Sequence, residues 1–156
     1  MNKYIKNVKK SWEPMFKEIF DNKEGYELFE YLESRKYTVY PKLNLMFNAF
    51  TFFELDELKT VFLGQDPYIG YEIHDGEEIE QAMGLSFSVP KEIKRVPPSL
   101  KNIYKEIKNS YPDYEIPNHG DLSDWALNKK MLLLNSALTT KKKKSNHHQK
   151  KWIEFT

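Results

Sequence analysis

The chain lacks cysteine altogether, so it can form no disulfide and offers no thiolate to a zinc ion or an iron–sulfur cluster. It also lacks any apolar run that approaches the ~20 residues of a membrane-spanning helix. Its basic N-terminal stretch is not followed by the apolar region of a secretion signal. These absences predict an intracellular protein without membrane contact, in the cytoplasm or, alternatively, in the nucleus.

An excess of charge of one sign is also missing. The sequence has 24 basic and 23 acidic residues, a formal net charge of +1. Net charge therefore gives no argument for nucleic acid, and a DNA-binding face must arise from local segregation of charge. Hydrophobic residues make up 40% of the chain, which is enough for a packed core. Without an internal repeat or a long linker, we expect a single domain over residues 1–156.

Helices are predicted wherever apolar residues recur at helical spacing. Two such stretches near the N-terminus are separated by a predicted break at Asp21–Gly25. A third follows Pro97-Pro98-Ser99, where Ser99 is a plausible N-cap, and Ser123 is the corresponding candidate before a short helix. The predicted helical stretches are 12–20, 26–35, 45–50, 100–107, 123–126 and the segment that begins at Trp152.

Two short apolar runs predict buried strands, Val61–Leu63 and Met131–Leu134. Strands that alternate with helices indicate an α/β fold with a mainly parallel sheet, and such sheets bind ligands beyond the carboxyl ends of their strands. Polar residues follow both runs: Gln65 and Asp66 after the first, Asn135 after the second. The sequence therefore predicts a polar site at one end of the sheet.

The remaining segments are less regular. Pro67 and two glycines make residues 64–70 a loop. Leu85–Val89 suits a short strand or an extended segment. Residues 72–80 are acidic and are expected to form a surface excursion.

Five motifs, in this order and at this spacing, resemble the uracil-DNA glycosylases. They are Gly64–Tyr68 (GQDPY), Gly84–Val89 (GLSFSV), Pro97–Glu106 (PPSLKNIYKE), His119–Ala126 (HGDLSDWA) and Leu132–Thr139 (LLLNSALT). The resemblance runs from about Ser11 to the last residue and corresponds to the N-terminal two-thirds of the family. Several linked motifs make it far more specific than a single glycine pattern.

The resemblance implies a three-layer α/β/α fold around a short, mainly parallel sheet. The family's sheet has four strands, and its last strand is expected to be missing here. The implied activity is hydrolysis of the N-glycosidic bond of uracil in DNA after base flipping, the first step of base-excision repair. No metal or organic cofactor is implied. The implied partner is uracil-containing DNA, bound by a monomer, and a protein inhibitor or replication partner is left unspecified.

The family's residue roles carry over onto matching positions. Asp66 would be catalytic, stabilising the cationic sugar and orienting the attacking water. Phe87 would stack on uracil, and the carboxamide of Asn135 would read its O4 and N3–H edge. Tyr68 would crowd C5 and exclude the thymine methyl group, while the backbone near Gln65 would hold O2, with the Gln65 side chain shaping that wall.

The same resemblance assigns the Pro97, Pro98 and Ser99 stretch to the DNA backbone, because proline gives a stiff wall and the following helix start can bind an anion. The basic run Lys141–Lys144 is either solvated or in contact with phosphate. His147 and His148 lack the spacing of zinc ligands, so no metal site is expected.

Three features depart from the family. Ile69 stands where the family has a histidine. The stretch Tyr71–Gln81 is longer than usual and acidic, without lysine, so we expect it to point away from DNA. The family's His-Pro-Ser-Pro-Leu segment does not occur before Thr156. Losing that histidine, a donor to a developing oxyanion, would cost roughly 10²–10³ in rate.

Plainer interpretations remain beside these roles. An aspartate in a Gly/Pro loop is often only a turn former, Phe87 could be core, and Asn135 could cap a strand end. The departures leave open a second function, a catalytically impaired DNA-binding or scaffolding remnant of the family. An unrelated nucleotide-binding α/β protein lacks support, because the chain has neither a phosphate-binding glycine–lysine loop nor a dinucleotide fingerprint.

Overall fold

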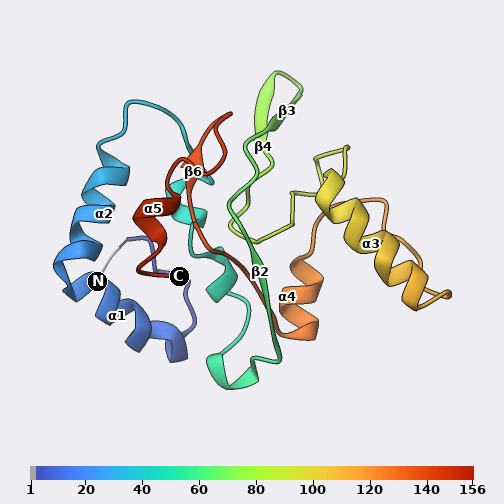
Figure 1. Ribbon diagram of the computed structural model, residues 1–156, viewed down its shortest axis with the longest axis horizontal. Coiled ribbons are helices and arrows are strands. Elements are labelled where there is room, and N and C mark those ends of the chain that lie inside the picture. Colours follow the sequence, from blue (N-terminus) through green and yellow to red (C-terminus); the bar gives the residue numbers. More distant parts are fainter. Residues whose placement is uncertain (1–2) are drawn as a thin grey trace.

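The computed structural model describes residues 3–156 (Figure 1). Its α-helices are α1 (Glu13–Asp21), α2 (Lys23–Glu33), α3 (Pro98–Ser110), α4 (Ser123–Lys129) and α5 (Gln149–Trp152). Its strands are β1 (Val39–Tyr40), β2 (Thr60–Gly64), β3 (Tyr71–His74), β4 (Glu77–Glu80), β5 (Met131–Asn135) and β6 (Thr140–Lys141). Short 3-10 helices span Lys10–Trp12, Leu43–Leu45, Asn48–Phe50 and Leu55–Glu57.

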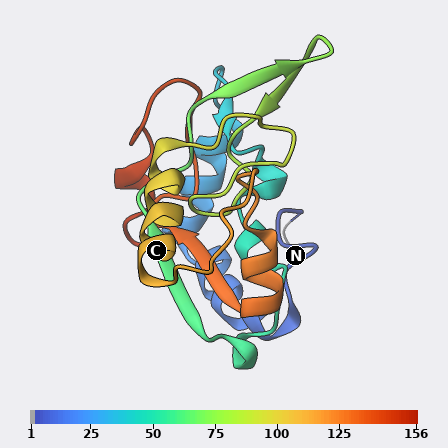
Figure 2. The ribbon, with the colours of Figure 1, turned by 90° about the vertical axis from the view of Figure 1, so that its right-hand side faces the viewer.

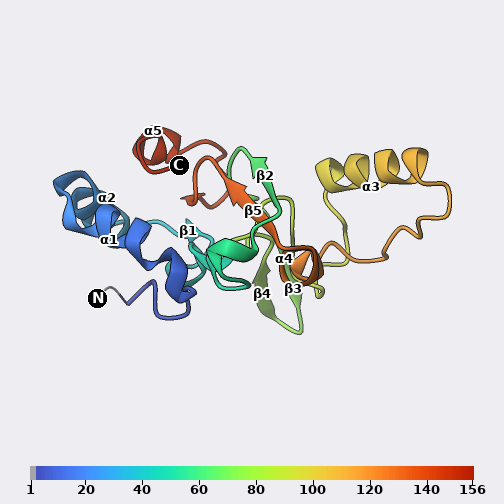
Figure 3. The same ribbon diagram turned by 90° about the horizontal axis from the view of Figure 1, so that it is seen from below.

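The centre of the fold is the parallel pair β2 and β5, which are in register from Thr60 opposite Met131 to Gly64 opposite Asn135. Helices α1, α2 and α5 lie on one side of this pair, and α3 and α4 lie on the other (Figures 1 and 3). The α/β class with a parallel centre is thus confirmed. Two antiparallel pairs, β1 with β6 and β3 with β4, complete the strands of the described region. No described helix is long and apolar enough to cross a membrane.

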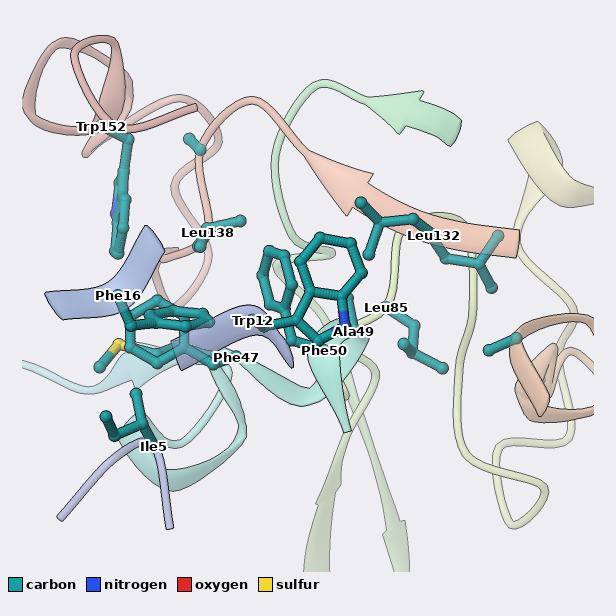
Figure 4. Close-up of a cluster of buried hydrophobic side chains, with 14 of the residues drawn as sticks. Ile5, Trp12, Phe16, Phe47, Ala49, Phe50, Leu85, Leu132, Leu138 and Trp152 are labelled. Atoms are coloured by element: carbon teal, nitrogen blue, oxygen red, sulfur yellow. The ribbon is translucent and has the colours of Figure 1, made fainter. Parts of the chain in front are cut away.

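The interior between the helices on one side and β5 is built largely from aromatic rings (Figure 4). Phe16 of α1 meets Phe47 at 4.7 Å and Phe50 at 5.0 Å between ring centroids, both edge to face. That geometry is the one that aromatic quadrupoles favour. Trp152 is fully buried in the same cluster, so α5 is tied to the core through its last residue.

The prediction that β2 is a buried strand is wrong. Val61 and Leu63 are 52% and 58% exposed, whereas Leu132 and Leu133 of β5 are buried. Side chains alternate along a strand, so Val61 and Leu63 share one face. Parallel strands are normally covered on both faces, and no described element covers this one. The apolar run correctly predicted a strand, but it wrongly predicted that both faces of the strand are buried.

The predicted break at Asp21–Gly25 is also too wide. Only Asn22 separates α1 from α2, and its side chain caps α2 by accepting the Gly25 N–H at 2.7 Å. Gly25 lies inside α2. Only glycine fits at this position, because a Cβ there would stand 1.8 Å from the carbonyl oxygen of Ile19. This glycine therefore serves close helix packing and does not end a helix.

Other local predictions fail at the level of single residues. Neither Ser99 nor Ser123 is an N-cap: α3 follows Pro97 and α4 follows Leu122, with each serine inside the first turn. The predicted 45–50 helix is replaced by two 3-10 turns. Residues 85–89, predicted as a short strand or an extended segment, contain no strand and turn at Ser86–Phe87, with Phe87 in the left-handed region at φ 61°.

The acidic stretch forms the hairpin β3–β4, which projects from the body (Figures 1 and 2). Asp75 and Gly76 at its tip both have positive φ, 51° and 83°, as an Asp-Gly hairpin turn requires. At its base, Glu72 accepts backbone N–H groups of Lys94 (3.0 Å) and Arg95 (3.2 Å). The surface excursion is therefore an ordered hairpin.

A buried histidine lies beneath α5. His148 is fully buried between Thr139 and Tyr37. Trp152 Nε1 donates to Thr139 Oγ1 at 2.8 Å, and the same hydroxyl shares a 2.9 Å hydrogen bond with His148 Nδ1. The other ring nitrogen, Nε2, shares a 2.9 Å hydrogen bond with the Tyr37 hydroxyl. Both ring nitrogens of His148 therefore have a partner inside the protein.

We expect this site to make stability depend on pH. Burial, with smaller contributions from His147 and Arg35, lowers the pKa of His148 to about 4 from an ordinary 6.5. Between these values the unfolded chain binds a proton that the folded protein excludes, so the free energy of unfolding falls as pH drops from about 6.5 to about 4. At pH 5 the loss from this one group is about 2 kcal/mol.

Urea unfolding at pH 7 and pH 5 measures that loss, with His148→Gln as the comparison. Glutamine does not titrate, so the variant's stability should change less between the two pH values than that of the unmodified protein. An equal change in both proteins would mean that His148 is not the group responsible.

Candidate active site

A cavity of about 290 Å³ opens at the carboxyl ends of β2 and β5. It is lined by Gly64, Gln65, Asp66, Pro67, Tyr68, Ile69, Phe87, Ser99, Asn135 and Ser145. Six residues that the sequence singled out therefore meet around one space, and they come from four separate motifs. Pro97 and Pro98 are not part of its lining.

The register of the two strands brings this site together. Gly64 and Asn135 are direct partners at the ends of β2 and β5. A Cβ on Gly64 would stand 2.3 Å from Asn135 Oδ1 and 3.0 Å from the Ser86 Cβ. A side chain at position 64 would therefore push the Asn135 amide out of place, and glycine leaves the room that it needs.

Asn135 presents an unused carboxamide. The residue is only 8% exposed, yet no hydrogen bond within the described residues involves its side chain. Its amide nitrogen and oxygen are not among the fully buried unpaired atoms of the described protein, so they reach the cavity surface. An amide with a free donor and a free acceptor at the cavity wall is thus suited to a ligand with the complementary pattern.

Phe87 forms an aromatic wall of the cavity. Its ring lies tilted on Phe62 of β2, with 4.8 Å between centroids. Ser86 fixes the preceding position by donating its N–H to the Leu133 carbonyl and its hydroxyl to the Phe62 carbonyl, both at 3.0 Å. The left-handed backbone of Phe87 is unfavourable for a non-glycine residue and is typical of functional sites.

Tyr68 closes the side opposite the strand ends. Its hydroxyl shares a 2.7 Å hydrogen bond with Ser99 and lies 3.3 Å from the Phe87 carbonyl oxygen. Burial raises the pKa of the Tyr68 phenol, so the ring stays neutral at physiological pH. The hydrogen bond ties the cavity loop to the first turn of α3.

The carboxylate of Asp66 is held by a distant turn. Asn146 donates its backbone N–H to Asp66 Oδ2 at 2.6 Å, and the Ser145 hydroxyl lies 3.1 and 3.2 Å from the two carboxylate oxygens. Beside it, Gln65 Nε2 donates to Asn146 Oδ1 at 2.9 Å. Ser136 donates its hydroxyl to the Gln65 carbonyl oxygen at 2.8 Å, so this loop is anchored on both sides.

The chain is similar in sequence to curated uracil-DNA glycosylases. The chain is 45% identical over 152 residues to a uracil-DNA glycosylase of Dichelobacter nodosus, covering 96% of this chain and 62% of that protein. A uracil-DNA glycosylase of Campylobacter hominis is 47% identical over 127 residues, covering 78% of this chain and 50% of that protein. The chain belongs to the uracil-DNA glycosylase family. It spans half to about three-fifths of the length of these two family members.

Solved structures of the uracil-DNA glycosylase family agree. The mimivirus uracil-DNA glycosylase superposes with a TM-score of 0.85 at 33% identity, covering 99% of this chain and 55% of that one. A variant of that mimivirus protein, in complex with UGI, gives a TM-score of 0.86. The glycosylase from Nitratifractor salsuginis, at 20% identity and a TM-score of 0.67, shares the fold. No family model matches the chain.

Two residues of this glycosylase-like site were not predicted. Ser145 and Asn146, which hold Asp66, follow the basic run, where Ser-Asn is an ordinary turn signal. Nothing local in the sequence connects a turn at 145–146 with a carboxylate at position 66. Phe62, the support of the Phe87 ring, was likewise predicted only as a strand residue.

The three residues of the Pro97-Pro98-Ser99 stretch differ in their burial. Pro97 is buried, Pro98 is exposed as the first residue of α3, and Ser99 lines the cavity. Pro98 and Ser99 are the more accessible of the three, and contact of this stretch with the DNA backbone stays a prediction.

Proposed function

We propose that this chain removes uracil from DNA by hydrolysing the bond between uracil N1 and sugar C1′. One observation carries the proposal: the carboxylate of Asp66, the ring of Phe87 and the free carboxamide of Asn135 surround one small cavity. A cavity of about 290 Å³ has room for a single base. The nucleotide would therefore have to be flipped out of the duplex to enter.

The cavity's polar groups favour uracil among the pyrimidines. The Asn135 amide can donate to uracil O4 and accept from its N3–H, whereas cytosine offers the reverse pattern at both positions. Phe87 gives the flat base a ring to stack on. Tyr68, whose hydroxyl is bonded to Ser99, would crowd C5 of the base and exclude the thymine methyl group.

The charge in the cavity suits the reaction. As the C1′–N1 bond breaks, uracil leaves with the electron pair and the sugar becomes cationic. Water then adds to C1′, and its proton is released. A carboxylate about 4 Å from the cation contributes about 4 kcal/mol at an effective dielectric of ~20. Asp66, held by Ser145 and Asn146, is the side chain placed to supply this stabilisation.

Contacts with DNA would form beside the cavity. Pro98 and Ser99 open α3, and free backbone N–H groups at a helix start attract phosphate. The exposed Lys143 and Lys144 can add to this surface, whereas Lys142 is already paired with Glu78 of the hairpin. We expect the acidic hairpin to point away from the DNA. Action as a monomer on intracellular DNA is part of the proposal.

The decisive assay compares oligonucleotides that carry one uracil, one cytosine or one thymine at the same position. Free base is measured at excess enzyme. Only uracil should be released, with discrimination of about 10⁴-fold, because wrong bases leave buried polar groups unpaired. Folded protein that releases no uracil at high concentration would exclude this function for the chain.

A second function, DNA binding without catalysis, is favoured by Ile69, which lines the cavity at the position where the family has a histidine. That function predicts DNA binding that weakens steeply with salt, without release of base. Release of uracil by this chain would argue against it.

A further inference from the structure

The hold on Asp66 comes from a surface turn that cannot be rigid by itself. Ser145 and Asn146 are both exposed, and Asn146 has a positive φ of 58°. Exposed turns generally have few contacts and higher mobility than the elements that they connect. Yet the 2.6 Å bond from the Asn146 N–H to Asp66 requires a fixed backbone. Gln65 holds the Asn146 side chain, and the Gln149 N–H donates to the Asn146 carbonyl oxygen at 3.3 Å, so what anchors the two ends of the turn decides how firmly it stands.

The upstream end of the turn is held by backbone bonds. Lys143 donates its N–H to the Ile69 carbonyl oxygen at 3.0 Å, and Lys144 donates to Lys141 at 2.9 Å. Ile69 belongs to the same cavity loop as Asp66, so this end follows that loop. The Thr140 hydroxyl adds to this hold, because it donates to the Lys144 carbonyl oxygen at 2.8 Å and accepts the His147 N–H at 3.4 Å.

The downstream end is held by a side chain. His148, two residues after Asn146, is fully buried, and both of its ring nitrogens are engaged, by Thr139 and by Tyr37. Thr139 is itself fixed by Trp152 of the core. The histidine therefore joins an exposed turn to the rigid interior of the protein.

We propose that His148 is a positioning residue for Asp66: it anchors the turn from which Ser145 and Asn146 hold that carboxylate at the cavity. The role rests on the proposed function as far as catalysis is concerned, because Asp66 acts there on the sugar. The anchor itself is a structural claim. Catalytic groups displaced by about 1 Å can lose up to 10²-fold in rate, so loosening the turn should be visible in turnover.

Tyr37→Phe is the mild test of the anchor, because it removes one hydroxyl and keeps the ring. Tyr31→Phe is the matched control: the Tyr31 hydroxyl lies 3.2 Å from that of Tyr37 but does not touch His148. His148→Gln is the stronger variant. The first readout is the rate of amide hydrogen exchange of Asn146, measured by NMR. It is divided by the exchange rate of the Ser86 amide, whose N–H donates to the Leu133 carbonyl oxygen of β5.

In Tyr37→Phe the Asn146 amide should exchange about five-fold faster relative to Ser86. This factor corresponds to the loss of about 1 kcal/mol, the net free energy of one hydrogen bond. In His148→Gln the increase should be larger, and in Tyr31→Phe it should stay below two-fold. An Asn146 amide that remains equally protected in both Tyr37→Phe and His148→Gln would overturn the proposal. This readout does not depend on activity.

The second readout is single-turnover release of uracil. Tyr37→Phe should lower the rate about five-fold without changing the affinity for DNA, and it should have no further effect once Asp66 is alanine. An equal loss in both backgrounds would show general damage and contradict the role. If the unmodified chain released no uracil while Asn146 exchange followed the expected order, the proposed function would fail and the anchor would stand.

Discussion

Replacing Asp66 with asparagine is expected to slow uracil release about 10³-fold. Asparagine keeps the shape and can still accept the Asn146 N–H, so the hydrogen bonds seen here can persist. What disappears is the negative charge facing the developing sugar cation, worth about 4 kcal/mol at an effective dielectric of ~20. At about 1.4 kcal/mol per factor of ten, this corresponds to roughly three decades of rate.

Single-turnover release from a uracil-containing duplex measures this loss, together with the affinity for the same DNA. Affinity should change little, since the charge acts mainly on the transition state. Asp124→Asn is the matched control: it makes the same chemical change on the exposed surface of α4, outside the cavity. An Asp66→Asn protein within ten-fold of the unmodified rate would remove Asp66 from the catalytic role.

Replacing Asn135 with leucine should separate activity from stability. Leucine has nearly the same shape but cannot bond the base, so uracil release should fall about 10²–10³-fold, the effect of losing hydrogen bonds to a developing anion. The free energy of unfolding should change by less than about 1 kcal/mol. The reason is that the carboxamide has no partner within the described protein, so the substitution breaks no hydrogen bond there.

Asn48→Leu provides the contrast. Asn48 is half-buried and therefore somewhat more exposed than Asn135. Unlike that of Asn135, its side chain donates a hydrogen bond to the Met83 carbonyl oxygen at 2.8 Å. The same substitution there should destabilise the protein by about 1–2 kcal/mol, because it leaves a carbonyl unpaired. Urea unfolding of both variants decides the matter: a clear loss of stability in Asn135→Leu would mean that its amide already has a structural partner.

Much of the site followed from local patterns. Two apolar runs ending in Asp66 and Asn135 were enough to predict that these residues meet, because parallel strands end at the same edge of a sheet. The GQDPY and GLSFSV motifs added Tyr68 and Phe87 through the family resemblance. All four line one cavity. The helices of the N-terminal half followed equally from apolar spacing, since that spacing reflects the face each helix buries.

The errors have a common cause. Ser99 is a good cap by residue type, yet its hydroxyl bonds Tyr68, a partner 31 residues away. Val61 and Leu63 have the composition of a buried strand, but what covers a strand lies elsewhere in the chain. Gly25 has the composition of a helix break, but it is needed where α2 crosses close to α1. In each case the surroundings in the folded protein, and not the residue type, decided the outcome.

By itself, the sequence determined the α/β class, the parallel strands and the chemical groups at their ends, because these depend on short periods and on motifs of a few residues. Only the tertiary structure decided how those groups are held: Asp66 by Ser145 and Asn146, and that turn by the buried His148. The physical reason is that a hydrogen bond between residues some 80 positions apart leaves no local pattern. It exists only once the core has brought both segments to the same place.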